Sequence, residues 1–194
     1  MRKIILLLMC FLSFNLFAAP QTFLQMNSEQ GDYIGQGLDY YFTEADGAFS
    51  ARPSYAGNPD HFKKSVSFSF MAPGFTDWWY LDFSTRQLSI NLQKGTYQAQ
   101  RFPFEPVGFA GLNVSGNGRG SNTLMGSFTI VDIDYNVNGE VNRFAASFEQ
   151  HSEGSTAALF GRIAYNSAAF YVNESSSAIL LAIGIAGFFI RKRH

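Results

Sequence analysis

Residues 65–70 read Ser-Val-Ser-Phe-Ser-Phe, an unbroken alternation of small polar and large apolar side chains. Successive side chains of a β-strand point to opposite faces of its sheet, so this pattern predicts a strand with one buried and one solvated face. The same period continues in Trp79-x-Leu81-x-Phe83 and in Leu88-x-Ile90-x-Leu92. We therefore expect strands in all three stretches.

The dipeptide Asn138-Gly139 separates two further alternating stretches. This pair favours a type I′ turn, because both central residues of that turn need positive φ. Pairing outward from the turn places Ile133 opposite Phe144 and Thr129 opposite Phe148 on a mostly apolar face. A slip of one residue would expose Ile133 and Phe144, so we expect a firm register.

The whole segment 20–173 follows the same plan. Alternating stretches are separated at short intervals by Gly, Pro and Asn, and no convincing helical period interrupts them. Many short strands between turns predict an all-β fold. We expect an antiparallel β-sandwich, jelly-roll-like or similar, formed by residues 20–173.

The formal net charge of −1 conceals an uneven distribution. Five of the fourteen basic residues lie at the two ends of the chain, which leaves nine against all fifteen acidic residues in the middle, or about −6. Nucleic-acid binding requires clustered Lys and Arg to neutralise phosphates. We therefore expect no nucleic-acid partner.

Residues 1–19 have the pattern of a secretory signal peptide. Arg2 and Lys3 precede the apolar stretch 4–17, and Ala18 and Ala19 are small residues suited to cleavage. Because Pro20 is a poor residue after a scissile bond, cleavage after Ala18 is favoured. The expected partners are the Sec translocon and signal peptidase.

The single cysteine, Cys10, lies within this apolar stretch. Lipidation of Cys10 is an alternative, but Met9 is a poor residue before a lipidated cysteine and the apolar stretch continues beyond it. An exported chain without cysteine must derive its stability from a packed core.

Residues 174–194 predict a membrane-spanning tail. Sixteen uncharged residues, Ser175–Ile190, precede Arg191, Lys192 and Arg193. As a helix they would extend about 24 Å against a bilayer core of about 30 Å, a mismatch that snorkelling and thinning can absorb. The basic cluster places the C-terminus in the cytoplasm and the β domain outside. A buried C-terminal helix is the alternative.

This tail resembles the PEP-CTERM class of bacterial sorting signals. Glu174, Ser175, the segment Gly184-Ile-Ala-Gly187 and the basic cluster 191–193 carry the resemblance, although Asn173 and Ser175 replace two prolines of that class. The resemblance implies recognition by an exosortase-like enzyme that cuts near Glu174. The domain is then released to the envelope or the extracellular space; without cutting, residues 175–190 anchor it in the inner membrane.

A second resemblance covers residues 31–166, which are similar to a family of uncharacterised exported bacterial β proteins. It is carried by the motifs Gly31-Asp-Tyr-Ile-Gly-Gln-Gly37, Ser115-Gly-Asn-Gly-Arg-Gly120, Asn122-Thr-Leu124, Gly126-Ser-Phe128, Phe148-Glu-Gln-His151, Glu153-Gly154 and Ala158-Leu159. Members usually have cysteines where this chain has Ser121 and Ser152. The resemblance implies that a disulfide has been lost as a pair, with the two Cα atoms within about 7 Å. It implies no catalytic residues.

Trp78 and Tyr80 have the opposite parity to Trp79, Leu81 and Phe83, so they should face outward beside Asp82. Exposed aromatic rings beside a carboxylate can stack on sugar rings and bind their hydroxyls. One interpretation is therefore an exopolysaccharide-binding surface. The favoured interpretation is that a loop covers the rings or that both faces of this strand are packed.

A weak calcium site is one interpretation of Asp134-x-Asn136-x-Asn138-Gly139, with Asp132 nearby, because this spacing matches the first half of an EF-hand loop. The twelfth position of that loop falls on Ala145, so the bidentate Glu is missing. The favoured interpretation is a solvated hairpin turn, and no cofactor is expected otherwise.

His151 lies between Glu149 and Glu153, with His61 elsewhere in the chain. An extracellular hydrolase or a metal-dependent enzyme would require these groups to converge in a pocket. The favoured prediction is instead a non-enzymatic protein of the envelope or extracellular matrix.

Overall fold

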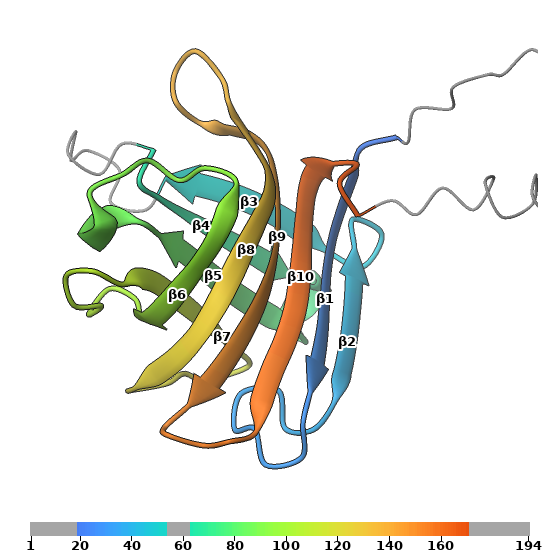
Figure 1. The fold of residues 1–194 in the computed structure, drawn as a ribbon. Helices are drawn as coiled ribbons and strands as arrows, with labels where there is room; N and C mark the ends of the chain where they lie inside the picture. The colour runs from blue at the N-terminus through green and yellow to red at the C-terminus, as the bar shows by residue number, and fades with distance from the viewer. Residues whose placement is uncertain (1–18, 54–62, 171–194) are drawn as a thin grey trace, which may run out of the picture. The chain divides into compact units, whose positions relative to one another are not determined.

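A computed structural model of the protein describes residues 19–53 and 63–170 (Figure 1). The predicted sorting tail, Cys10, Ala18 and His61 lie outside these residues, as does all of the predicted signal peptide except Ala19. The described residues form short 3₁₀ turns at Pro73–Phe75 and Arg86–Leu88 and ten strands, β1 (Gln21–Ser28), β2 (Asp39–Thr43), β3 (Ala48–Pro53), β4 (Ser65–Met71), β5 (Trp78–Ser84), β6 (Gly95–Arg101), β7 (Ala110–Gly116), β8 (Leu124–Tyr135), β9 (Val141–Ser152) and β10 (Ala158–Ser167). The predicted all-β class is confirmed.

These strands form one continuous sheet in the order β2-β1-β10-β9-β8-β6-β7-β5-β4-β3. Neighbours are antiparallel except β6 and β7, which run parallel. The predicted sandwich is not confirmed, because hydrogen-bonded neighbours connect all ten strands into a single curled, mixed sheet. In Figure 1, β8, β9 and β10 lie in front of β4, β5 and β7.

The two edge strands of this sheet are consecutive in the chain. β2 and β3 stand at opposite ends of the strand order, yet only residues 44–47 connect them. Asp46 holds the connection, because its Oδ2 accepts hydrogen bonds from the backbone N and Oγ1 of Thr43 at 2.8 and 2.7 Å. A Cβ at Gly47 would lie 2.4 Å from the carbonyl oxygen of Met71, so glycine is required at this corner.

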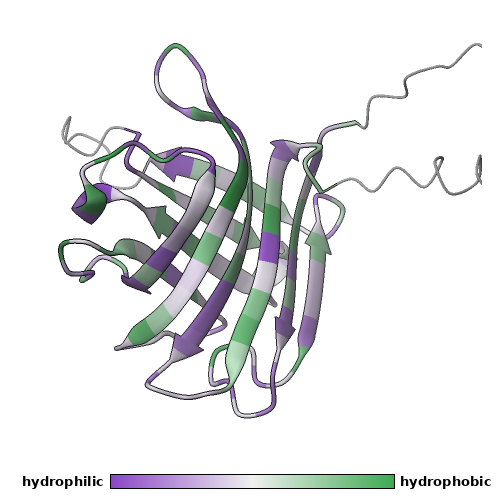
Figure 2. Cartoon of the chain, in the orientation of Figure 1, coloured by the Kyte–Doolittle hydropathy of each residue, from purple (hydrophilic) through white to green (hydrophobic). Residues whose placement is uncertain are grey.

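Aromatic side chains fill the interior between the two halves of the sheet. The ring centroid of Phe144 on β9 lies 4.8 Å from that of Phe68 on β4 and 5.3 Å from that of Phe83 on β5. Each buried aromatic or aliphatic side chain contributes about 1.5–3 kcal/mol to folding. Because one face of each strand is turned to this interior and the other to solvent, hydrophilic and hydrophobic residues follow one another along β10 (Figure 2).

Gly161 on β10 is part of this interior packing. A Cβ at Gly161 would lie only 2.3 Å from the ring of Phe148, its partner on β9. The missing side chain therefore leaves the space in which the phenyl ring lies.

Gln150 fastens β9 to β7 through the interior. Its side chain is fully buried, and its amide both accepts from the backbone N of Val114 at 2.8 Å and donates to the Val114 carbonyl at 2.9 Å. β6 pairs with β7 only as far as Leu112, so the amide of Gln150 satisfies the backbone groups of Val114 beyond the end of that pairing.

The hairpin of β8 and β9 forms, but parts of its predicted geometry are wrong. Ile133 does face Phe144, whereas Thr129 pairs with Ser147 instead of Phe148. The shift arises at a β-bulge between Ile130 and Asp132, which adds one residue to β8. Because of the extra residue, Ile130 and Ile133 both turn inward although they are three positions apart.

The turn of this hairpin is also not the predicted type I′. Of its central residues only Gly139 has positive φ, 79°. The side chain of Asn136 determines the shape instead, because its Oδ1 accepts hydrogen bonds from the backbone N of Asn138 at 2.9 Å and of Glu140 at 3.0 Å. This local bonding favours a wider turn that ends in the left-handed glycine.

The strand predicted through Leu88, Ile90 and Leu92 is wrong. Leu88 ends a 3₁₀ turn, and Ser89 adopts a left-handed conformation with φ of 58°. Leu92 is buried while Ile90 is exposed, so the alternation reflects loop packing and not a pleated strand.

Candidate functional site

The outer face of β5 carries the predicted aromatic pair. Trp79 and Leu81 are buried, whereas Tyr80 is 38% exposed and Trp78 is half-buried. The ring centroids of Trp78 and Tyr80 lie 5.7 Å apart with an interplanar angle of 56°. The predicted outward parity is confirmed, and the two rings form one continuous aromatic surface.

Hydroxyl groups flank this surface. Tyr80 lies opposite Ser69 of β4 on one side and Ser115 of β7 on the other. The Oγ of Ser69 is hydrogen-bonded to the Oγ of Ser50 at 2.7 Å. Within the described part of the chain, the hydroxyls of Tyr80 and Ser115 make no hydrogen bond. An aromatic ring with such groups beside it can stack on a sugar ring and bind its hydroxyls.

Asp82 lies on the same face but is tied to its neighbours. Its carboxylate accepts hydrogen bonds from the hydroxyl of Ser67 and, at 3.0 Å, from the Nδ2 of Asn113. Burial raises the pKa of Asp82, and these two hydrogen bonds only partly oppose the effect. The carboxylate therefore serves the packing of β4, β5 and β7 more than it offers a charge to a ligand.

The carboxylates proposed for calcium are arranged around cations. Asp132 bonds to the Nε of Arg143 at 3.0 Å and to the Oγ of Ser167 at 2.8 Å, and Lys94 lies 3.8 Å away. Burial alone would raise the pKa of Asp132, but these hydrogen bonds and positive charges hold it below its usual value. Asp134 bonds to the same guanidinium at 3.2 Å.

The two asparagines of the calcium motif lie in the turn. The Oδ1 of Asn136 is occupied by the backbone N of Asn138 and of Glu140. Among residues 19–53 and 63–170, no group of three or more His, Cys, Asp or Glu side chains is placed to hold a metal ion. The motif residues instead form hydrogen bonds within the turn and ion pairs with Arg143.

The residues of the enzymatic alternative are only partly brought together. The Nε2 of His151 lies 2.8 Å from the Oε1 of Glu149 on the outer face of β9. Glu153 instead accepts hydrogen bonds from the backbone N of Asn122 and of Thr123, which hold its pKa below the usual value.

Ser121 and Ser152 are in direct contact, as the second resemblance implied. Their hydroxyl oxygens lie 2.7 Å apart, and both side chains are buried. The contact ties the loop before β8 to the end of β9.

The other motifs of that resemblance meet at the same end of the sheet. Buried Asp32 accepts from the backbone N of Gly35 at 2.7 Å and from the Oγ of Ser28 at 2.8 Å. Arg119 reaches from the loop after β7 to the carbonyl of Ile34 at 2.7 Å. These contacts give the motif residues a structural role, closing this end of the fold.

Comparisons with protein-family models, with curated proteins and with solved structures gave no match for this chain. Within the described residues, no helix has the length and apolar character needed to cross a membrane.

Proposed function

We propose that this is an exported, non-enzymatic β protein that binds exopolysaccharide through the outer face of β5. The observation that carries the proposal is the pair of aromatic rings, Trp78 and Tyr80, presented between the hydroxyl-bearing strands β4 and β7. Stacking supplies affinity for the sugar face, while the hydroxyls of Tyr80 and Ser115 supply hydrogen bonds.

Export and retention belong to the same proposal and are supported by the sequence. The apolar segments near the two ends, with Arg2 and Lys3 before the first and 191–193 after the last, match a signal peptide and a sorting or anchoring tail. We propose a location in the inner membrane with the domain outside, or release after processing near Glu174.

A non-enzymatic role is supported by the outer face of β9. His151 and Glu149 form a pair, but Glu153 is directed to the backbone of residues 122–123. A hydrolytic site built on this pair would need a third group in reach of a substrate, and Glu153, the acid that the enzymatic alternative offers, is bonded to backbone elsewhere.

Affinity electrophoresis of the purified full-length protein in gels containing hydroxyethylcellulose, dextran or alginate tests the binding proposal. We expect at least one polymer to retard the protein, and the variant Trp78→Ala/Tyr80→Ala to lose most of this retardation. Tyr33→Ala is a matched control, because Tyr33 is a tyrosine in the loop between β1 and β2 that is 54% exposed. Equal retardation of wild type and the double variant would contradict the proposal.

A further inference from the structure

A second aromatic ring lies on the outer face of the other half of the sheet. Phe160 on β10 is 39% exposed, almost the same fraction as Tyr80. It lies opposite Glu149 of β9 on one side and Asn27 of β1 on the other. An exposed phenyl ring with polar side chains on both neighbouring strands can stack on a sugar ring and lies close to groups that bind its hydroxyls.

Two surface hollows adjoin this ring. One is lined on its far side by Ser127, Thr129 and Glu149, and the other by Gln25, Asn27 and Arg162. Ser147, Phe160 and Gly161 line both. The side chain of Ser147 is short, so the phenyl ring stands between two depressions of the sheet surface.

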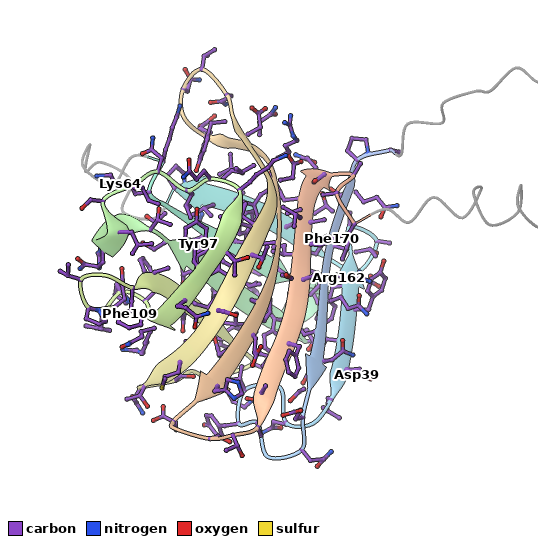
Figure 3. All side chains as sticks on the ribbon, in the orientation of Figure 1. Asp39, Lys64, Tyr97, Phe109, Arg162 and Phe170 are labelled. Carbon is purple, nitrogen blue, oxygen red and sulfur yellow. The ribbon has the colours of Figure 1, made fainter. Side chains whose placement is uncertain are left out.

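Polar groups in these hollows are placed to bind hydroxyls. In the described part of the chain, the hydroxyls of Ser127 and Ser147 make no hydrogen bond to other residues. The Nε of Arg162 (Figure 3) donates to the Oε1 of Gln25 at 2.7 Å, which fixes both side chains at the edge of one hollow. The other hollow offers the carboxylate of Glu149 as an acceptor. Such a row of hydroxyl, amide and carboxylate groups matches a chain of polyhydroxylated sugar units.

The Trp78–Tyr80 surface and the Phe160 surface face away from each other. Phe83 of β5 and Phe144 of β9 contact each other in the interior, with ring centroids 5.3 Å apart. Tyr80 has the opposite parity to Phe83 on β5, and Phe160 has the opposite parity to buried Leu159 on β10. Each surface therefore points outward from its own half of the sheet.

We infer that Phe160 and its two hollows form a second polysaccharide-binding surface, so that one domain bridges two polysaccharide chains. This inference rests on the proposed function of the Tyr80 surface. A protein with two outward-facing sites cross-links a polymer, and loss of either site leaves binding but removes the cross-link.

The test uses purified full-length protein and whichever of the three polymers retards it most. Calorimetry with a short oligosaccharide of that polymer counts the sites, and viscometry of the polymer measures cross-linking. We expect two sites per chain for wild type and for Tyr33→Ala, and one site for Phe160→Ala and for Trp78→Ala/Tyr80→Ala. Each one-site variant should lose the viscosity increase, and its affinity for immobilised polymer should fall by about 100-fold or more.

Ser147→Lys is a second variant that leaves Phe160 in place. A long side chain at this position fills both hollows from an outward-facing site, so it should also reduce the count to one. Thermal unfolding of each variant confirms that it is folded.

The outcomes separate the two proposals. One site in wild type that only Trp78→Ala/Tyr80→Ala removes would overturn the second surface and leave the proposed function standing. One site that only Phe160→Ala removes would overturn the proposed role of Trp78 and Tyr80, and with it the bridging. No retardation of wild type by any polymer would overturn both.

Discussion

A disulfide between positions 121 and 152 is the most direct test of how this fold is held together. In the double variant Ser121→Cys/Ser152→Cys, the two sulfur atoms replace hydroxyl oxygens that lie 2.7 Å apart. A disulfide needs about 2.05 Å between sulfurs, and the C–S bond is longer than the C–O bond, so little backbone movement is required. We expect the bond to form on oxidation.

The bond should stabilise the fold by an amount set by the loop that it closes. Thirty-one positions separate the two residues, and the chain-entropy model gives about 3.7 kcal/mol for a loop of that length. For a domain of this size, that gain corresponds to a rise in Tm of roughly 10 °C. The reduced variant should instead be slightly less stable than wild type, because it loses the buried hydrogen bond between hydroxyls.

Urea unfolding of the oxidised and reduced double variant measures the difference directly. Cys10→Ala in the background removes the only natural thiol, and the two single cysteine variants are the controls. The loss of two hydrogens in the intact mass verifies the bond. Oxidised protein that forms no bond, or forms it without a gain over the reduced protein, would show that the ends of β9 and of the loop before β8 are not arranged as described.

Three further predictions test the packing of the sheet. Gly161→Ala should destabilise the fold by about 1–3 kcal/mol through overpacking, whereas Gly120→Ala, whose Cβ would meet no atom closer than 3.8 Å, should have little effect in the same denaturation assay. Gln150→Leu should lower the free energy of unfolding by about 2–5 kcal/mol, because two backbone groups of Val114 lose their partner. Hydrogen exchange should speed up at the Val114 amide. Unchanged exchange would argue against the bonds between the Gln150 side chain and Val114. Burial raises the pKa of Asp82 above its ordinary 3.8. The contribution of Asp82 to stability is therefore full below pH 3.8 and is lost as the pH rises through the raised pKa. Asp82→Asn should remove this pH dependence, so the stability of wild type relative to the variant should decline from pH 4 to pH 7.

Local alternation predicted the strands whose two faces differ most. In 65–70 and 78–83, every second residue is large and apolar, and no other local structure buries such a set. The stretch through Leu88 and Ile90 shows why the argument fails elsewhere. Three apolar residues at period two also suit a 3₁₀ turn followed by a loop, and the left-handed Ser89 between them leaves no local signal that a sequence pattern detects.

The arrangement of the strands could not be predicted in the same way. Whether ten strands form one sheet or two depends on pairings such as β1 with β10 and β6 with β7, which join distant segments. The bulge near Val131 likewise depends on the partner strand, because it allows Ile130 and Ile133 to reach one core. The outward parity of Tyr80 was predictable, but the flanking Ser69 and Ser115 were not, since long-range register alone brings them to its sides.

The distribution of internal hydrogen bonds indicates where a ligand would bind. Several polar groups of the motif segments bond within the fold: Asp32 bonds within its own loop, Arg119 reaches the carbonyl of Ile34, and Ser121 bonds to Ser152. Side chains that are already satisfied and buried gain little from a ligand, because binding would first have to break those bonds. The outer faces of β5 and β10 offer the opposite condition, aromatic rings open to solvent beside hydroxyls that the described residues leave unbonded. Recognition is therefore to be sought on these outer faces of the sheet and not at the end that Asp32, Arg119 and Ser121 close.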